Sequence, residues 1–263
     1  MPFLDLICLA NSIKMRGRCV AGLLVDGKGW VRPIAADTDH GQLLLRHFRL
    51  DDGSEPKALD LVRLPLTRAQ PAPGQPENWV IGEERWVLKA RPLGPNLYPR
   101  LRDAITTGPV LLGSTQARVS APAATQLTSS LALIKPSKLQ WYLKRDLYDR
   151  LQPRTRFDLD GQTYDLPVTD PAWTSRILRR LSQGEPGFYP QEKLGLSGDS
   201  PVLLTVSLGE AFNGSARRIR HGRRALRRLD VRPGAHPRNH RFPAHALSDA
   251  ALGAMRVLWT CRL

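Results

Sequence analysis

Short apolar runs that alternate with turn signals recur along most of this chain, and they constrain its fold more than any other feature. The clearest apolar segments lie at residues 4–10, 19–25 and 202–208, and strand-like segments that mix apolar and polar residues lie at 58–66, 155–159 and 163–168. Asp26-Gly27 and Asp160-Gly161 each follow such a run, and this pair favours a tight hairpin turn. Because strand signals outnumber helical ones and strands do not alternate with long helices, the pattern predicts small barrels or sandwiches.

Helical signals are few. Residues 171–181 carry apolar side chains at helical spacing, with arginines on the opposite face. Asp170 and Pro171 stand at the start of this segment, which predicts an N-cap followed by proline at the first helical position. A second, short helix is expected at residues 98–105. Four tryptophans are expected to pack in the core: Trp79, Trp86, Trp141 and Trp173.

The segment that begins at Pro136 repeats the strand-and-turn rhythm of the first half, which predicts two domains and a tail. We expect a first barrel with insertions over residues 1–135 and a second barrel over residues 136–213. Residues 214–263 form an Arg-rich tail of different composition. The predicted fold class is therefore mostly β, with two small barrels, short helices and an Arg-rich C-terminal tail.

The chain of 263 residues is strongly basic, since 39 Lys and Arg against 24 Asp and Glu give a formal charge of +15. A balance of this size is typical of proteins with a polyanionic partner, either nucleic acid or an anionic membrane surface. Arg outnumbers Lys about fourfold, and an excess of Arg is also what a GC-rich gene produces. Two thirds of the net charge falls in residues 214–263, so the rest of the chain is only modestly basic.

The C-terminal tail has two further features. Residues 214–263 contain twelve Arg and no Lys, a composition that binds phosphates without sequence preference or is simply a solvated appendix. His236, His240 and His245 have a spacing that resembles a metal site. No cysteine lies near them, and Asp249 is the one nearby carboxylate, so we expect no bound metal.

Several classes of function lack their sequence signals. No apolar run approaches the ~18 residues of a membrane span, and no signal peptide is visible. Cys8, Cys19 and Cys261 form no disulfide framework, which fits a reducing cytoplasm. Phosphate-binding glycine loops, nucleophile elbows and zinc-protease sequences are missing. We expect no catalytic residues and no cofactor; the alternative is an enzyme with an unrecognised site near Asp170 and Asn11.

The candidate nucleic-acid-binding residues are mostly cations near the first predicted strands. They are Asn11, Lys14, Arg16, Arg18, Lys28, Trp30 and Arg32. If they share one rim of a barrel, the cations can follow the backbone of a single strand while the indole ring of Trp30 stacks on a base. The alternative is that Trp30 packs in the core and the cations are solvated loop residues.

Several strings of the sequence together resemble the bacterial dual OB-fold domain family. They are ICLANS at 7–12, GRCVAG at 17–22, WVRP at 30–33, LDDG at 50–53, QPENW at 75–79, YDL at 164–166, VTDPAW at 168–173 and VSLGE at 206–210. The similarity covers residues 3 to about 213. It implies two OB-like barrels and nucleic-acid binding, often in proteins encoded beside genes for mobile-element defence. After Glu210 the chain departs from the family pattern, as a frameshift in a GC-rich gene would cause. In that case the second barrel lacks its closing strand.

The function we expect is that of a non-catalytic, cytoplasmic nucleic-acid-binding protein, with DNA or RNA as partner and single strands favoured. It would be an accessory component of a bacterial defence or mobile-element system. The alternative is an adaptor subunit, which presents protein-binding surfaces to a larger nucleoprotein complex of the CRISPR type. No membrane partner is expected.

Overall fold

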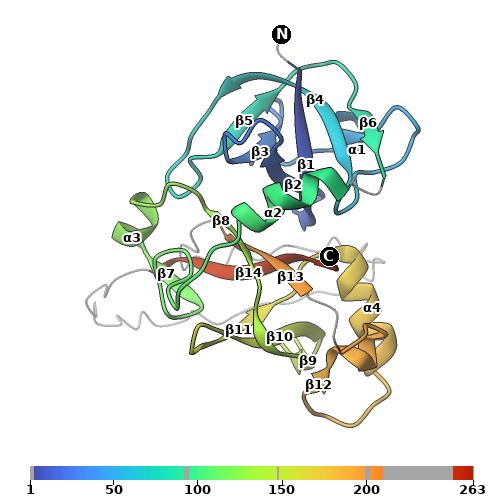
Figure 1. The fold of residues 1–263 in the computed structure, drawn as a ribbon, viewed down its shortest axis with the longest axis vertical. Helices are drawn as coiled ribbons and strands as arrows, with labels where there is room; N and C mark the ends of the chain where they lie inside the picture. The colour runs from blue at the N-terminus through green and yellow to red at the C-terminus, as the bar shows by residue number, and fades with distance from the viewer. Residues whose placement is uncertain (1–2, 92–94, 147, 199–201, 210–250, 263) are drawn as a thin grey trace, which may run out of the picture.

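The computed structural model describes residues 3–91, 95–146, 148–198, 202–209 and 251–262. It contains two β-barrels, one formed by strands within residues 3–81 and the other by strands within residues 131–167, 202–208 and 251–262 (Figure 1). Strands β13 and β14 of the second barrel lie beside the first barrel, and β9, β10 and β11 lie at the far end of the molecule (Figure 1).

The first barrel is a closed five-stranded Greek key of the OB type. Its strands are β1 (Phe3–Lys14), β2 (Gly17–Leu24), β3 (Trp30–Ile34), β4 (Leu61–Ala69) and β5 (Asn78–Ile81). The order is β1-β2-β3-β5-β4, and β4 pairs back onto β1; β3 and β5 run parallel. Helix α1 (Leu45–Phe48) connects β3 to β4, and β6 (Val87–Ala90) extends the sheet beyond β4.

Strand β1 closes the first barrel because its two halves pair with different neighbours. Residues 3–7 pair with β4 and residues 6–14 with β2. At Gly22 the two strands approach so closely that a Cβ atom would stand 2.0 Å from the carbonyl oxygen of Ile7, which requires glycine.

The second barrel repeats this arrangement. Its strands are β8 (Leu131–Ile134), β9 (Ser137–Arg145), β10 (Leu151–Leu159), β11 (Gln162–Pro167), β13 (Val202–Leu208) and β14 (Ala251–Arg262). β8 and β9 act as the two halves of one first strand, since β8 pairs with β13 and β9 pairs with β10. β14 pairs with β13, and Val257 bridges Val168 in parallel. Helix α4 (Pro171–Leu181) follows the third strand, in the place of α1.

Smaller elements surround the barrels. They are η1 (Pro95–Leu97), α2 (Tyr98–Asp103), β7 (Arg118–Ser120), α3 (Ala121–Thr125), β12 (Tyr189–Pro190) and η2 (Gln191–Leu194). α2 and α4 confirm the two predicted helices. β7 pairs with β14, so the segment before β8 packs on the second barrel.

The strands of the barrels differ from the predicted domain limits at two points. The predicted boundary after residue 135 falls inside the first strand of the second barrel, because Pro136 only interrupts that strand between β8 and β9. Residues 251–262, which the prediction assigns to the tail, form β14, the closing strand that a frameshift would remove. Most of the Arg run and the tail histidines fall in residues 210–250, outside the described residues.

Each barrel has its own apolar core. Trp86 lies in the first, with Leu6 and Cys8 of β1, and Trp141 lies in the second. Trp173 of α4 stacks on Trp141 with ring centroids 5.4 Å apart. The expectation of core tryptophans is thus confirmed for Trp86 and Trp141, while Trp79 and Trp173 are partly buried against these cores.

A third cluster joins the two barrels. Ile7, Leu9 and Leu23 point outward from β1 and β2 and pack against Leu133 and Leu203 of the second barrel. Because alternate residues of a strand face opposite sides, β1 is apolar on both of its faces. The outer sheet face of the first barrel is therefore an interface between the barrels.

A buried ion pair lies at this interface. Arg32 is 2% exposed, and its Nη2 lies 3.0 Å from Oε1 of Glu77. The same Nη2 donates to the hydroxyls of Ser130 (2.7 Å) and Ser207 (3.2 Å), both from the second barrel. Glu77 in turn accepts from the backbone N–H of Ser130 (3.0 Å) and from its hydroxyl (2.6 Å). These hydrogen bonds bind the two barrels in one orientation.

Removing one partner of this pair should destabilise the protein strongly. Glu77→Ala leaves the Arg32 charge buried without a counter-ion, and we expect a loss of about 3–5 kcal/mol in the free energy of unfolding. Glu55→Ala is the matched control, because it breaks the half-exposed Arg18–Glu55 pair and should cost about 1 kcal/mol or less. Urea denaturation of both variants measures the difference, and equal losses would show that the buried pair has no special role.

Candidate nucleic-acid interface

The structure does not bring the predicted binding residues to one rim. Lys14, Arg16 and Arg18 lie at or beside the β1–β2 turn, whereas Lys28 lies in the β2–β3 turn at the other end of the ladder. The eight-residue strand β2 separates these turns by about 23 Å at ~3.3 Å per residue. Arg16 and Lys28 are exposed, and Lys28 pairs with Asp26.

Most of the other predicted residues are engaged within the protein. Arg18 forms an ion pair with Glu55 (3.1 Å), and the amide of Asn11 donates to the carbonyl of Pro56 (2.9 Å). Nζ of Lys14 donates to the carbonyl of His40 (2.6 Å). A role of these three residues in nucleic-acid binding therefore stays a prediction.

The structure argues against the predicted binding roles of Arg32 and Trp30. Arg32 cannot contact a ligand on the surface, because its guanidinium is buried between the barrels and paired with Glu77. Trp30 is partly buried against the interface clusters, next to Ala10 and Ala21. The alternative that Trp30 packs rather than stacks is thus the one that the structure favours.

The second barrel has an open sheet face in the position that is covered in the first. On β10, Thr155 and Phe157 point inward, while Arg154 and Arg156 alternate with them on the outside. On β9, Tyr142 lies directly across from Arg154 in the antiparallel register. We call the outward side chains of β9, β10 and β11, together with Phe188, the β9–β11 face.

An aromatic pair lies on the β9–β11 face. Phe188, from the loop before β12, is 46% exposed and packs on Tyr142 with ring centroids 4.8 Å apart. The guanidinium carbon of Arg156 stands 5.5 Å from the centre of the Phe188 ring. A flat ring with a cation beside it is the arrangement on which a base stacks while its phosphate is neutralised.

A hydrogen-bond network fixes Tyr142 in place. Its hydroxyl donates to Oδ2 of Asp165 (2.5 Å), and Nε of Arg154 bonds both the same hydroxyl (2.9 Å) and Oδ1 of Asp165 (2.7 Å). Burial raises the pKa of Tyr142, and the bond to Asp165 raises it further. The phenol therefore stays neutral near neutral pH and serves as a rigid support for Phe188.

The β9–β10 turn carries a further exposed aromatic beside the face. Tyr148 is 78% exposed, and the guanidinium carbon of Arg150 lies 5.0 Å from its ring centre. Asp146 pairs with Arg150 (2.8 Å) and accepts from the backbone N–H of Tyr148, which orders the turn. In OB barrels the loop between the first two strands borders the ligand.

Sequence reasoning missed the β9–β11 face. Arg154 and Arg156 alternate with buried residues in a segment that was correctly expected to be strand-like, and this alternation was the available signal. Phe188 could not be found, because only the fold brings its loop across Tyr142.

The predicted N-cap of α4 is confirmed. Oδ1 of Asp170 accepts a hydrogen bond from the backbone N–H of Trp173 (2.8 Å), with Pro171 at the first helical position. The carboxyl is buried where α4 meets β1, and burial raises its pKa from 3.8 to about 6 against the lowering effect of these backbone hydrogen bonds.

Within the described ranges, no group of three or more His, Cys, Asp or Glu side chains is placed to hold a metal ion. None of the helices in the described part of the chain has the length and apolarity needed to cross a lipid bilayer.

Comparison with known proteins agrees with this architecture. A family model described as a dual OB-containing domain matches residues 4–222. The chain belongs to the dual OB-containing domain family. Comparisons with curated proteins and with solved structures gave no match.

Membership in the dual OB-containing domain family accounts for the repeated strand order. OB barrels are a fold type that commonly binds nucleic acid, on the face of the second and third strands and the adjoining loops. In this member that face is buried in the first barrel and open in the second.

The raised pKa of Asp170 predicts a pH-dependent stability. The folded state binds the carboxyl proton more tightly than the unfolded state, so the contribution of Asp170 to stability is full below pH ~3.8 and is lost as the pH rises through about 6. Asn caps equally well without a charge, so Asp170→Asn should gain at most about 3 kcal/mol over the wild type between pH 4 and pH 7. Thermal unfolding at several pH values measures this gain, and a pH-independent difference would show that the carboxyl is not desolvated.

Proposed function

We propose that this protein binds single-stranded nucleic acid through the β9–β11 face without catalysing a reaction. The observation that carries the proposal is the aromatic pair of Phe188 and Tyr142 with Arg156 beside it, on the open sheet face of an OB barrel. Bases stack on such rings with little sequence preference, and arginines hold the backbone.

The charges of the β9–β11 face favour single-stranded nucleic acid over a protein as the partner. Lys138 pairs with Asp158 and Arg154 pairs with Asp165, whereas none of the described residues forms an ion pair with Arg156. Lys144, on the outer side of β9, is also exposed. Within the described part of the chain Arg156 interacts with Asp158 only through its charge, so its guanidinium N–H groups are available to bind a phosphate with two hydrogen bonds.

The non-catalytic part of the proposal rests on how the best acid–base candidates are used. Asp170 is occupied as a helix cap. His47 accepts from the backbone N–H of Leu44 at Nδ1 (3.1 Å), and its Nε2 lies 3.2 Å from Asp37. Both ring nitrogens are therefore engaged, and neither is aimed at a substrate. An accessory role in bacterial defence, which the family resemblance implies, belongs to the same proposal.

Removing the stacking ring should weaken binding. Phe188→Ala is expected to lower the affinity for a fluorescein-labelled 20-nucleotide DNA or RNA about 5- to 100-fold, since stacking contributes about 1–3 kcal/mol per base. Arg156→Ala should also reduce the slope of log K against log salt by about 0.7. Fluorescence anisotropy measures both effects.

Two controls make this test decisive. Arg179→Ala removes an exposed arginine of α4 and should leave affinity and salt slope unchanged. The triple variant of Lys14, Arg16 and Arg18 to Ala tests the β1–β2 turn. Loss of binding in the triple variant alone would place the site on the first barrel and refute the assignment to the β9–β11 face.

The adaptor alternative has its own observation. Ile13 and Met15 are more than half exposed at the β1–β2 turn, and large apolar side chains on a surface turn suit a protein partner. A pull-down from native cells at physiological salt separates the two functions. A partner retained after nuclease treatment and lost in Met15→Ser supports the adaptor, and material removed by nuclease supports nucleic-acid binding.

A further inference from the structure

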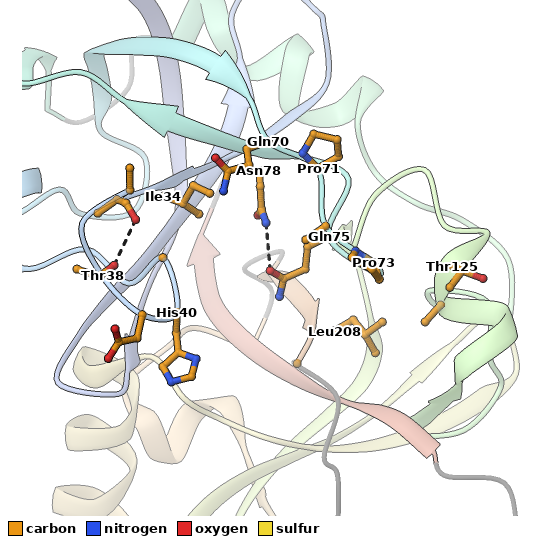
Figure 2. Close-up of a pocket in the computed structure, with 18 residues that line it drawn as sticks. Ile34, Thr38, His40, Gln70, Pro71, Pro73, Gln75, Asn78, Thr125 and Leu208 are labelled. Atoms are coloured by element: carbon orange, nitrogen blue, oxygen red, sulfur yellow. Dashed lines mark hydrogen bonds between the residues drawn. The ribbon is translucent and has the colours of Figure 1, made fainter.

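A second candidate site lies between the barrels, away from the β9–β11 face. A cavity of about 480 Å³ is lined by the β3–α1 loop, by the loop between β4 and β5, by α3 and by the end of β13. This volume is typical of pockets that take small molecules. In Figure 2, Asn78 and Gln75 occupy the middle of the cavity, with His40 on one side and Pro73 and Leu208 on the other.

Backbone hydrogen bonds hold the walls of the cavity in place. Ala72 and Gln75 exchange two backbone hydrogen bonds (3.1 and 2.8 Å) across a turn of Pro73 and Gly74. Gly74 has φ +69°, which fits a turn with proline at its second position and glycine at its third. On the facing loop, the hydroxyl of Thr38 donates to the carbonyl of Gln42 (2.9 Å). The cavity is thus preformed.

Asn78 provides the strongest sign that this cavity takes a ligand. Its side chain is 4% exposed and lines the cavity, and its Nδ2 donates to Oε1 of Gln75 (3.3 Å). Its Oδ1 has no hydrogen-bond partner among the described residues. A buried carbonyl oxygen without a donor is costly, and a ligand N–H would satisfy it.

The lining chemistry narrows the class of ligand. Among the described residues that line the cavity none is Lys or Arg, and Asp39 adds a negative charge, so phosphate and carboxylate groups do not suit it. Ile34, Pro71 and Leu208 supply apolar walls, and Gln70, Gln75 and Asn78 supply amides. Flat apolar walls with amide donors and acceptors fit an uncharged heterocycle that carries N–H groups.

We propose that this cavity binds a nucleobase, presented either by a free nucleoside or by the end of a nucleic-acid strand. A rotation of the Asn78 side chain brings its shielded Oδ1 to the cavity, where it accepts an N–H of the base, and the prolines of the β4–β5 loop contact the ring. The site is independent of the β9–β11 face, since it is built from other elements and its proposed ligand contacts are not ionic.

Calorimetric titration of the full chain with adenosine, guanosine, cytidine and uridine tests this proposal. We expect at least one nucleoside to bind with a millimolar or tighter dissociation constant, and ribose and inorganic phosphate not to bind. Ala72 is exposed at the mouth of the cavity, so Ala72→Trp should fill it and weaken binding at least 20-fold without disturbing the fold. Ala69→Trp is the matched control, because Ala69 is also exposed but does not line the cavity; it should bind normally.

The remaining arms separate the outcomes. Asn78→Leu keeps a similar side-chain volume but removes the acceptor, and it should weaken nucleoside binding about 10-fold. Phe188→Ala should leave nucleoside binding unchanged, so failure of the β9–β11 face and failure of this site are distinguishable. If Ala72→Trp also weakens the binding of an oligonucleotide, the base is presented by a nucleic-acid strand. If oligonucleotide binding is unchanged, the ligand is a free nucleoside. No binding of any nucleoside, or equal binding by Ala72→Trp, would overturn the proposal.

Discussion

The buried pair of Arg32 and Glu77 determines how the two barrels sit against each other. A charge pair removed from water needs further hydrogen bonds, and here Ser130 and Ser207 of the second barrel bond Nη2 of Arg32, while its Nε has no partner among the described residues. The apolar contact of Ile7 and Leu9 with the second barrel stabilises the association of the barrels but does not fix their relative orientation. The hydrogen bonds of the polar network fix that orientation.

This orientation gives two similar barrels different surfaces. Contact between the barrels buries the outer sheet face of the first barrel. The corresponding face of the second barrel stays open and carries the pair of Tyr142 and Phe188. The same docking places the β4–β5 loop of the first barrel against α3 and Leu208, which creates the cavity around Asn78. One interface thus covers the outer sheet face of one barrel and creates a pocket elsewhere.

Local features of the sequence were predictable and relations between distant segments were not. Asp170 was predicted as a helix cap because its partner lies three residues away, and the strands followed from apolar runs and turn pairs. Arg32 was misassigned because its partners come from residue 77 and from the other barrel. The apolar run 6–10 did contain a hint of the interface, since a strand covered on both faces has no polar alternation.

The late position of β14 has a consequence for how the chain folds. Contacts that close the first barrel join residues no more than 90 positions apart in the sequence. In contrast, β13 pairs with β14, which follows residues 210–250 and is therefore synthesised much later. During synthesis the first barrel therefore completes early and presents Ile7, Leu9 and Leu23 before Leu203 can cover them. A nascent chain with a bare apolar sheet face is prone to association until the second barrel covers that face.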